Sequence, residues 1–318
     1  MTTYFVCSDI HGFYKEWMHS LKKAGFEKDN SEHILIILGD IFDRGHETIN
    51  TFNFIMSLPK QRAILVRGNH ENLFLSLLEK DFPESHDFSN RTVSTFCEIA
   101  GYDEELLDRE YWIIKAIWED KDIEEYSRFP FVIWNIVRNK VAKHKITKFL
   151  KSNRWINYYE MKDYIFVHSW IPCATKSSND GTPEEIGYRE DWRNATQTEW
   201  DDATWGCPWK KAIYGWNRTG KTIVCGHWHT SDFFIHLTKQ RKNISNCPIF
   251  KSKRYKLIGL DACTALTKRV NVLKIVDKSE EETARAIDMV LEAYNNHMNG
   301  GKMYTTEEVV SMIEKNIK

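Results

Sequence analysis

The sequence has no surplus of either charge. Its 318 residues include 44 lysines and arginines against 45 aspartates and glutamates, a formal net charge of −1. Proteins dedicated to nucleic-acid binding attract the phosphate backbone mainly through an excess of lysine and arginine. We therefore expect no dedicated binding of DNA or RNA, although a balanced total leaves room for a local basic patch.

Cysteine pairs and long apolar segments are also missing. The seven cysteines form no CxxC pair, and Cys7, Cys225 and Cys263 lie inside apolar runs, where a thiol packs as a small hydrophobic group. This pattern predicts a reduced, cytoplasmic protein without a disulfide framework. No apolar run approaches the ~18 residues of a membrane span, and no signal-like segment opens the chain. We expect a soluble, unprocessed protein without membrane contact.

The sequence does contain a recurring pattern, a short apolar run that ends abruptly in acidic, histidine or asparagine residues. Runs of this length and composition are typical of buried β-strands. A further apolar run, 270–276, lacks the polar end. The runs with polar ends are YFVCSDIHG (4–12), HILIILGD (33–40), AILVRGNHE (63–71), YIFVHS (164–169), TIVCGHWH (222–229) and KLIGLDAC (256–263).

Helical patterns separate the first three runs. Apolar residues recur at four-residue steps from Phe13 to Leu21, and Gly25 follows as a helix end. Residues 46–58 and 71–80 are also expected to be helical. Alternating strands and helices predict parallel strands, whose functional groups gather beyond their carboxyl ends. We expect the polar ends of the runs to meet at one sheet edge.

The other segments do not follow the strand pattern. Residues 81–163 are rich in aromatic and charged residues, with helical patterns near 103–118 and 132–151, and we interpret them as an insertion that covers or flanks the site. Amphipathic patterns after the last run predict a helical extension. The chain is thus divided into a main domain, 1–278, and a C-terminal helical extension, 279–318.

Several polar strand ends carry groups that bind divalent metal ions. Asp9 and His11 lie on one side of an extended segment, because side chains in a strand alternate with period two. The other candidates, each at the end of a run, are Asp40, Asn69, His168, His227 and His229. A two-metal phosphoryl-transfer site needs carboxylates and imidazoles, one carboxylate bridging ions ~3.5–4 Å apart. One histidine at a strand end is more often structural, but the combination predicts a metal site.

The ordered series SDIHG, GDIFDRG, GNHE, VHS and GHWH resembles the calcineurin-like metallophosphoesterase superfamily. Its first three blocks are most similar to the phosphoprotein-phosphatase branch, which includes bacterial and phage lambda-type serine/threonine phosphatases and symmetrical diadenosine tetraphosphatases. The resemblance covers about 4–80, 164–170 and 222–276. It implies an α/β sandwich of two mixed β-sheets flanked by helices, with the insertion and the C-terminal tail outside the shared scaffold.

The resemblance also implies two metal ions that share one ligand. The residues implied for the first ion are Asp9, His11 and Asp40. Those implied for the second ion are Asp40, Asn69, His168 and His227. The phosphoprotein-phosphatase branch usually has one histidine in its last motif, but the wider superfamily uses a second for the first ion, which makes His229 a further ligand. This set without thiolates suits Mn²⁺ best, with Fe, Zn²⁺, Co²⁺ or Ni²⁺ as alternatives.

In the mechanism that the resemblance implies, a metal-bridging hydroxide attacks phosphorus in line. His70 would act as the general acid, oriented by Asp43, and Arg44 would bind the phosphate. The branch places a second phosphate-binding arginine in an interval that here contains Arg189, Arg193 and Arg218. Of these we favour Arg193.

The motifs leave the substrate open. The leading hypothesis is a phosphomonoesterase of the serine/threonine protein phosphatase type. The alternative is a dinucleoside tetraphosphatase or another nucleotide phosphohydrolase, because the same motifs serve both. A metal-binding module without activity is disfavoured by the intact Asp9, Asp40, Asn69 and His70. We expect a monomer whose partner is a phosphorylated protein or nucleotide.

One string imitates a nucleotide-binding loop. Residues 215–222, GWNRTGKT, satisfy the pattern GxxxxGK[ST]. A phosphate-binding loop of that kind follows a strand and opens a helix. This string instead ends the Trp-rich, turn-rich connection 170–221 and leads into an apolar run. We expect an ordinary loop that binds no nucleotide.

Overall fold

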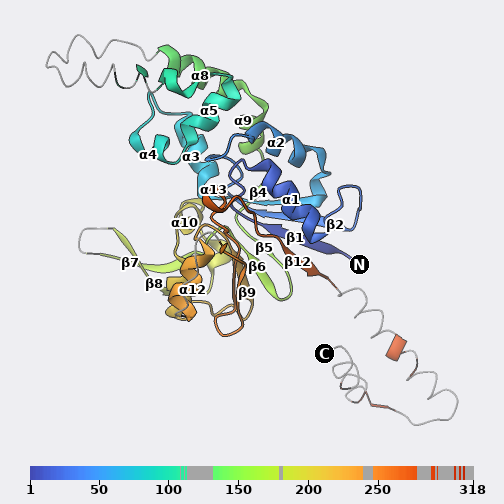
Figure 1. Cartoon of the computed structure of the whole chain (residues 1–318). Coiled ribbons are helices and arrows are strands. Elements are labelled where there is room, and N and C mark those ends of the chain that lie inside the picture. The colour runs from blue at the N-terminus through green and yellow to red at the C-terminus, as the bar shows by residue number, and fades with distance from the viewer. Residues whose placement is uncertain are drawn as a thin grey trace.

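The structure is a computed structural model in which two mixed, five-stranded β-sheets pack face to face, with helices on the outer faces (Figure 1). This confirms the predicted sandwich. A smaller two-stranded sheet lies outside it. The described residues are 1–107, 109–110, 112, 132–178, 182–238, 246–277, 288–290, 292, 304–305, 308 and 311.

The first sheet has the order β12–β1–β2–β3–β4. Its strands are β1 (Thr3–Cys7), β2 (His33–Leu38), β3 (Ala63–Val66), β4 (Trp155–Ile156) and β12 (Leu273–Val276). Strands β1 to β3 run parallel as predicted, with Val6 opposite Ile36 and Ile36 opposite Ile64, whereas β12 is antiparallel to β1. The carboxyl ends of β1, β2 and β3 therefore share one edge.

The second sheet has the order β10–β11–β9–β6–β5. Its strands are β5 (Tyr159–Glu160), β6 (Tyr164–Phe166), β9 (Thr222–Cys225), β10 (Phe250–Ser252) and β11 (Leu257–Gly259). Strands β6, β9 and β11 are parallel, so their carboxyl ends also share an edge. Every predicted strand is present. The expectation of a single sheet edge was wrong, because the polar ends are divided between two sheets.

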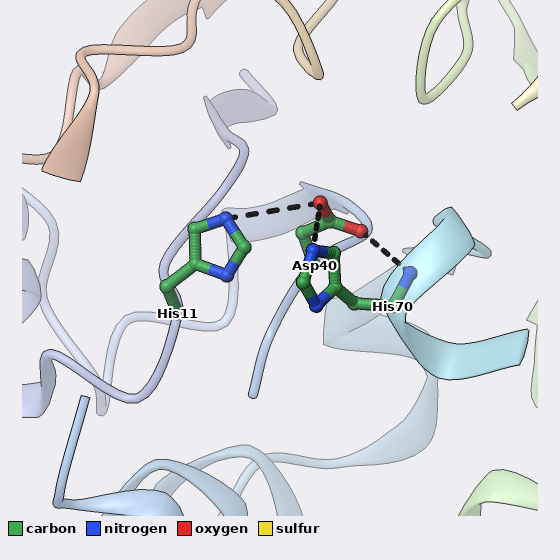
Figure 2. A group of neighbouring side chains, drawn as sticks. All are labelled: His11, Asp40 and His70. Atoms are coloured by element: carbon green, nitrogen blue, oxygen red, sulfur yellow. Dashed lines mark hydrogen bonds and ion pairs between the residues drawn. The ribbon is translucent and has the colours of Figure 1, made fainter. Parts of the chain in front are cut away.

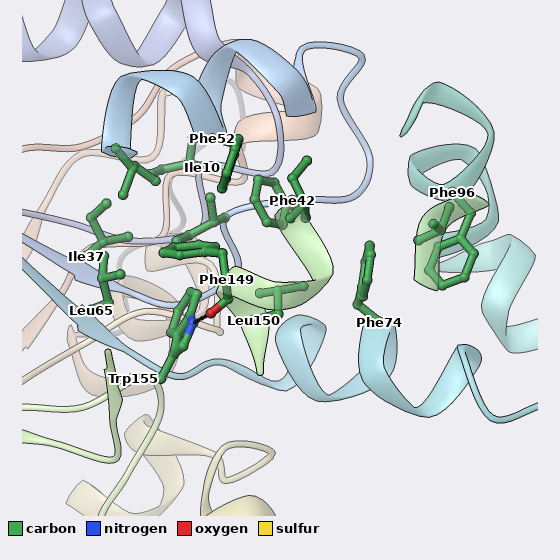
Figure 3. Packing of buried hydrophobic residues seen from close by; sticks show 14 of the residues in the cluster. Ile10, Ile37, Phe42, Phe52, Leu65, Phe74, Phe96, Phe149, Leu150 and Trp155 are labelled. Atoms are coloured by element: carbon green, nitrogen blue, oxygen red, sulfur yellow. Dashed lines mark hydrogen bonds between the residues drawn. The ribbon is translucent and has the colours of Figure 1, made fainter. Parts of the chain in front are cut away.

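Both faces of the first sheet are buried. In β1, Tyr4 and Val6 face the second sheet, and Phe5 and Cys7 face the outer helices. Figure 3 shows this outer layer, where Ile37 and Leu65 lie beneath aromatic side chains. Burial on both faces explains why the parallel strands are almost continuously apolar.

The helices predicted between the first strands are confirmed. They are α1 (Tyr14–Ala24), α2 (Thr48–Ser57) and α3 (Asn69–Leu77), with the short 3₁₀ helix η1 (Lys60–Arg62) before β3. Gly25 ends α1 with a φ of +87°, and its N–H donates to carbonyls of the last turn. Only a residue that tolerates the left-handed region ends a helix in this way without strain.

The insertion forms a helical layer at one end of the molecule (Figure 1). Its helices are α4 (Ser85–Ser89), α5 (Thr92–Ala100), α8 (Val132–Lys143) and α9 (Lys145–Leu150). The helical pattern near 132–151 is confirmed. Of the pattern near 103–118, residues 104–107 are helical, and most of the remainder lies outside the described residues. Helix α5 was not predicted.

The connection 170–221 contains more regular structure than its turn-rich composition indicated. It holds β7 (Cys173–Ser177), β8 (Pro183–Tyr188), the 3₁₀ helix η2 (Trp192–Asn194), α10 (Gln197–Ala203) and α11 (Pro208–Ile213). Two further helices follow later strands, α12 (Thr230–Thr238) and α13 (Thr264–Thr267).

The predicted C-terminal helices lie almost entirely outside the described residues. Thr305 and Glu308 are described and form reciprocal hydrogen bonds, with Thr305 N donating to Glu308 Oε2 at 2.9 Å and Glu308 N donating to Thr305 Oγ1 at 3.2 Å. These are the contacts of a capping box. Within the described part of the chain, no helix has the length and apolar character needed to cross a bilayer.

Candidate active site

Polar residues just beyond the strands of both sheets meet in one group. Asp9 and Asp40 each lie two residues past the end of a first-sheet strand, and His168 and His227 two residues past a second-sheet strand. His168 Nε2 lies 2.8 Å from Asn69 Oδ1 and 3.4 Å from Asp40 Oδ1. The sandwich therefore closes the two halves of the predicted site onto each other.

Asp40 lies at the centre of this group. Its Oδ2 is 3.8 Å from His11 Nε2 and 3.9 Å from His70 Nε2, and its Oδ1 accepts the backbone N–H of His70 at 3.1 Å. Figure 2 shows the rings of His11 and His70 both directed at the same oxygen of the Asp40 carboxylate. Each of the groups His11–Asp40–His70 and Asp40–His168–His227 has its potential ligand atoms within 4.8 Å of one another.

The histidine contacts fit a cation between these side chains. His11 Nδ1 donates to the carbonyl oxygen of Phe42 at 3.0 Å, so its buried Nε2, which has no hydrogen-bond partner, presents a lone pair. His168 Nδ1 likewise donates to the carbonyl of Leu38 at 2.6 Å, which turns Nε2 toward two acceptor oxygens. Lone pairs that face one another in a buried site need a positive charge, from a proton or a metal ion.

The charges at the site also favour a cation. Burial and the neighbouring Asp40 raise the pKa of Asp9 to about 6. Burial alone would lower the pKa of His168, but the charges of Asp40 and Asp9 outweigh it and raise that pKa. Carboxylates that repel each other in a buried place gain most from a bound cation.

The last motif, GHWH, extends the group on the second sheet. The backbone N–H of His227 donates to both carboxylate oxygens of Asp9, at 3.0 and 3.2 Å. Burial and the charge of His168 lower the pKa of the His227 ring to about 3, which keeps it neutral and able to bind a metal. His229 Nε2 lies 3.9 Å from Asp261 Oδ2.

The backbone at the site is strained and tightly held. Asp9, His11, Asp40 and His227 all have φ between +52° and +64°, a region that non-glycine residues rarely adopt. The buried carboxylate of Glu71 accepts the N–H groups of Asp40, Ile41 and Gly68 at 3.0, 2.9 and 2.8 Å. These bonds hold the loops after β2 and β3 together.

Asp43, Arg44 and His70 form a second arrangement beside the first. His70 Nδ1 donates to Asp43 Oδ2 at 2.6 Å, and His70 Nε2 lies 3.2 Å from Arg44 Nη2. Burial alone would lower the pKa of His70, but the charge of Asp40 and the hydrogen bond and charge of Asp43 raise it. Because a guanidinium only donates, His70 Nε2 accepts from Arg44 in this arrangement.

Four functional candidates were missed in the sequence. Glu71 belongs to the quoted GNHE motif, and Asp261 lies two residues past β11, the same position as Asp9 and Asp40, so both had a local signal. Thr92 and Thr95, which donate to Asp43, had none, because α5 was not predicted.

Arg193 is not among the residues that the structure brings together, which corrects our expectation. Its guanidinium donates to the Glu160 carboxylate at 2.7 and 2.9 Å and lies 4.3 Å from the centroid of the Trp192 ring. Glu160 also pairs with Lys221, which directly precedes β9. Because His227 follows the other end of β9, Arg193 lies at the end of the sheet remote from the site.

The string 215–222 has the structure of an ordinary loop, as predicted. Lys221 Nζ donates to the Met161 carbonyl at 2.7 Å and pairs with Glu160 at 2.8 Å. Thr222 begins a strand and not a helix. The helix N-terminus that would complete a phosphate cradle is therefore replaced by a strand.

Comparison with known proteins gives matches to phosphatases. The serine/threonine-protein phosphatase SIT4 of Candida albicans is 33% identical over 97 residues, which is 29% of this chain and 31% of that protein. The symmetrical bis(5'-nucleosyl)-tetraphosphatase of Buchnera aphidicola subsp. Baizongia pistaciae is 36% identical over 77 residues, 24% of this chain and 26% of that protein. The chain thus spans less than a third of the length of these relatives.

A solved structure and a family model cover more of the chain. A cold-active protein tyrosine phosphatase superposes with a TM-score of 0.50 at 15% identity, covering 87% of this chain and 75% of that one, a likeness of fold alone. Residues 2–231 match the model of the calcineurin-like phosphoesterases. The chain therefore belongs to the calcineurin-like phosphoesterase family.

Proposed function

We propose that the protein is a metal-dependent phosphoesterase that hydrolyses phosphomonoesters, with phosphoserine and phosphothreonine proteins as substrates. The observation that carries this proposal is the convergence of lone-pair donors around Asp40, directly beside the Asp43–His70 pair and Arg44. Members of the family use divalent metal ions, and the chain offers candidate residues for them.

The unpartnered Nε2 of His11 and the acceptor oxygens facing His168 support two cations at this place. The residues proposed to hold them are Asp9, His11, Asp40, Asn69, His168, His227 and His229. Two divalent cations, for which we propose Mn²⁺, would offset charge on the phosphate oxygens and lower the pKa of the attacking water.

The remaining groups act on the phosphate and on the leaving group. Arg44 binds the phosphate oxygens. As the bond from water oxygen to phosphorus forms, the bond to the serine oxygen breaks, and its electron pair stays on that oxygen. Once Arg44 turns from His70 Nε2 to the phosphate, that nitrogen can hold a proton and deliver it to this oxygen, while Asp43 holds Nδ1.

The test compares leaving groups. A serine alkoxide needs a proton to depart, whereas a nitrophenolate needs little. His70→Asn should therefore slow hydrolysis of a phosphoserine peptide at least about tenfold more than that of nitrophenyl phosphate, because general acids contribute ~10²–10⁴-fold. Single-turnover rates and metal content are measured, with the exposed His19→Asn as control. Equal losses on both substrates would reassign His70 to phosphate binding.

Nucleotide substrates are the second candidate, and Trp205 favours them. Its side chain is 52% exposed, and its ring meets the His227 ring edge-on at a centroid distance of 5.9 Å. Exposed aromatic rings stack on nucleobases. A panel of phosphopeptides, diadenosine tetraphosphate and cyclic nucleotides, each with Mn²⁺, separates the candidates. If nucleotides are the substrates, Trp205→Ala raises their KM and leaves that of phosphopeptides unchanged.

We also propose that the protein acts as a cytoplasmic monomer. None of its seven cysteines forms a disulfide bond, and most are buried, which suits a reducing compartment. Light scattering of the full chain at several concentrations tests the monomer, and a constant dimer mass would contradict it.

A further inference from the structure

We propose that Thr92 and Thr95 of the insertion are positioning residues for the Asp43–His70 pair. This inference rests on the proposed role of His70 as general acid. It assigns the insertion a part in proton transfer, beyond covering or flanking the site.

The carboxylate of Asp43 is buried and is bonded on both oxygens. Oδ2 accepts from His70 Nδ1 at 2.6 Å and from Thr92 Oγ1 at 2.9 Å, and Oδ1 accepts from Thr95 Oγ1 at 2.6 Å. Asp43 is 0% exposed. The two threonines therefore determine how the carboxylate is turned, and the carboxylate determines how the His70 ring is turned.

These contacts are unlike those of other buried threonines. The hydroxyls of Thr51 and Thr147 donate to backbone carbonyls, at 3.0 and 2.6 Å. Thr95 has the carbonyl of Arg91 within 3.4 Å, but its much closer acceptor is the Asp43 carboxylate. A threonine hydroxyl in a helix can bond to a backbone carbonyl of the preceding turn. The closer contact of Thr95 with the Asp43 carboxylate therefore indicates a more specific role.

Helix α5 is held firmly against the element that carries His70. The Phe96 ring of α5 lies 4.7 Å from that of Phe74 in α3, and stacks at 5.5 Å on Trp134 of α8. Figure 3 shows Phe74 and Phe96 facing each other. Since α3 begins at Asn69 and His70, this packing fixes the distance between the threonines and the imidazole.

The location of the threonines adds an electrostatic contribution. Thr92 and Thr95 occupy the first turn of α5, three residues apart and so on one face. The partial positive charge at a helix N-terminus favours a carboxylate there. Asp43 is thereby kept as an acceptor for His70 Nδ1, which leaves Nε2 to carry the proton toward the substrate.

The experiment uses Thr92→Val and Thr95→Val in the full, metal-loaded chain. Each substitution should lower kcat for phosphoserine hydrolysis on the order of tenfold and leave KM little changed. A loss of this size is part of the ~10²–10⁴-fold acceleration that a general acid contributes. Nitrophenyl phosphate hydrolysis should change much less. Thr95→Ser, which keeps the hydroxyl, should restore the rate. Thr147→Val is the matched control, a buried threonine of the insertion that bonds to backbone, and it should show no leaving-group difference.

A second readout keeps this inference separate from the proposed function. In the chain loaded with diamagnetic Zn²⁺, the proton on His70 Nδ1 gives a downfield NMR resonance whose position reports the bond to Asp43. This resonance should shift in Thr95→Val and keep its wild-type position in Thr95→Ser. The outcome does not depend on how His70→Asn affects turnover. Thr95→Ala replaces the valine variant if that chain does not fold. An unmoved resonance, or equal losses on both substrates in the threonine variants, would overturn the proposal.

Discussion

The ligand candidates of the first sheet are all deeply buried, whereas those of the second sheet range from the buried His168 to the partly exposed His227 and His229. Asp9, Asp40 and His70 are at most 3% exposed, and Glu71 ties the loops of Asp40 and His70 together through three backbone N–H groups. On the second sheet, His227 is half-buried beside the exposed ring of Trp205, and the side chain of His229 is 35% exposed.

This difference indicates a division of labour. The first-sheet half is prearranged, because its strained backbone is held by internal hydrogen bonds before any ligand arrives. In the second-sheet half, His227, His229 and Trp205 form an accessible rim. Changes in the first half should therefore abolish the chemistry, and changes at this rim should weaken binding.

The largest effect is expected for Asp40→Asn. The substitution keeps the shape of the side chain and removes the charge between both groups of ligands, so at least one metal equivalent should be lost. Turnover of nitrophenyl phosphate should fall by on the order of 10³-fold, the upper end for loss of one preorganised electrostatic group. Metal analysis and kinetics measure both, with the exposed Asp29→Asn as control. If the variant retains two ions and normal turnover, Asp40 is not a metal ligand.

A smaller effect is expected for His229→Ala on the rim. We expect affinity for one metal ion to drop by more than the ~10–100-fold that loss of a group behind a metal ligand causes, because His229 is proposed as a direct ligand, with the other ion retained. Calorimetric titration with Mn²⁺ measures the affinities, and the urea midpoint should change little. His19→Ala is the control. Loss of both ions would contradict the proposed division between the two halves.

Glu71→Gln tests whether the first half is prearranged. The amide cannot accept three backbone N–H groups as the carboxylate does, so the free energy of unfolding should fall by about 2–3 kcal/mol. Urea unfolding of the variant is compared with Glu79→Gln, an exposed glutamate near the end of α3. A loss no greater than that of the control would mean that Glu71 does not hold the loops.

The smallest effect is expected far from the site, at Glu160. Its hydrogen bonds to Arg193 and Lys221 lower its pKa from 4.5 to about 2. A carboxylate whose pKa is lowered in the folded state stabilises the fold at pH values above its ordinary pKa. This contribution is lost as the pH falls toward 2. Glu160→Gln should cost at most about 1 kcal/mol at pH 7, as for surface ion pairs. Urea midpoints of the two chains should converge below about pH 4.5; a gap that widens there would refute the assignment.

Much of the scaffold could be predicted because its signals are local. Buried strands such as β2 are apolar after their first residue and stop abruptly at a glycine and an aspartate, and α1 has apolar residues at helical spacing before Gly25. The motifs around Asp9 and Asp40 are contiguous, so the positions of these side chains follow from strand ends. Their roles as metal ligands remain a prediction.

Other features had no local signal. Arg193 lies in the interval that the resemblance implied, but its partner Glu160 is 33 residues away and draws it to the other end of the sheet. Asp261 had the strand-end position of a site residue, but the contact with His229 appears only when β11 packs beside β9. Spacing in a sequence does not indicate which of several charged neighbours a side chain meets.

By itself, the sequence determined the strands, their polar ends, the first helices and the family resemblance. The spacing of apolar residues, the local composition and the contiguous motifs each involve only a few neighbouring residues. Only the tertiary structure decided that the ends of two different sheets face each other across Asp40. It alone placed Thr95 beside Asp43, 52 residues earlier in the chain. Such contacts depend on how whole elements pack, and the packing of α5 against α3 through Phe96 and Phe74 leaves no pattern in either segment alone.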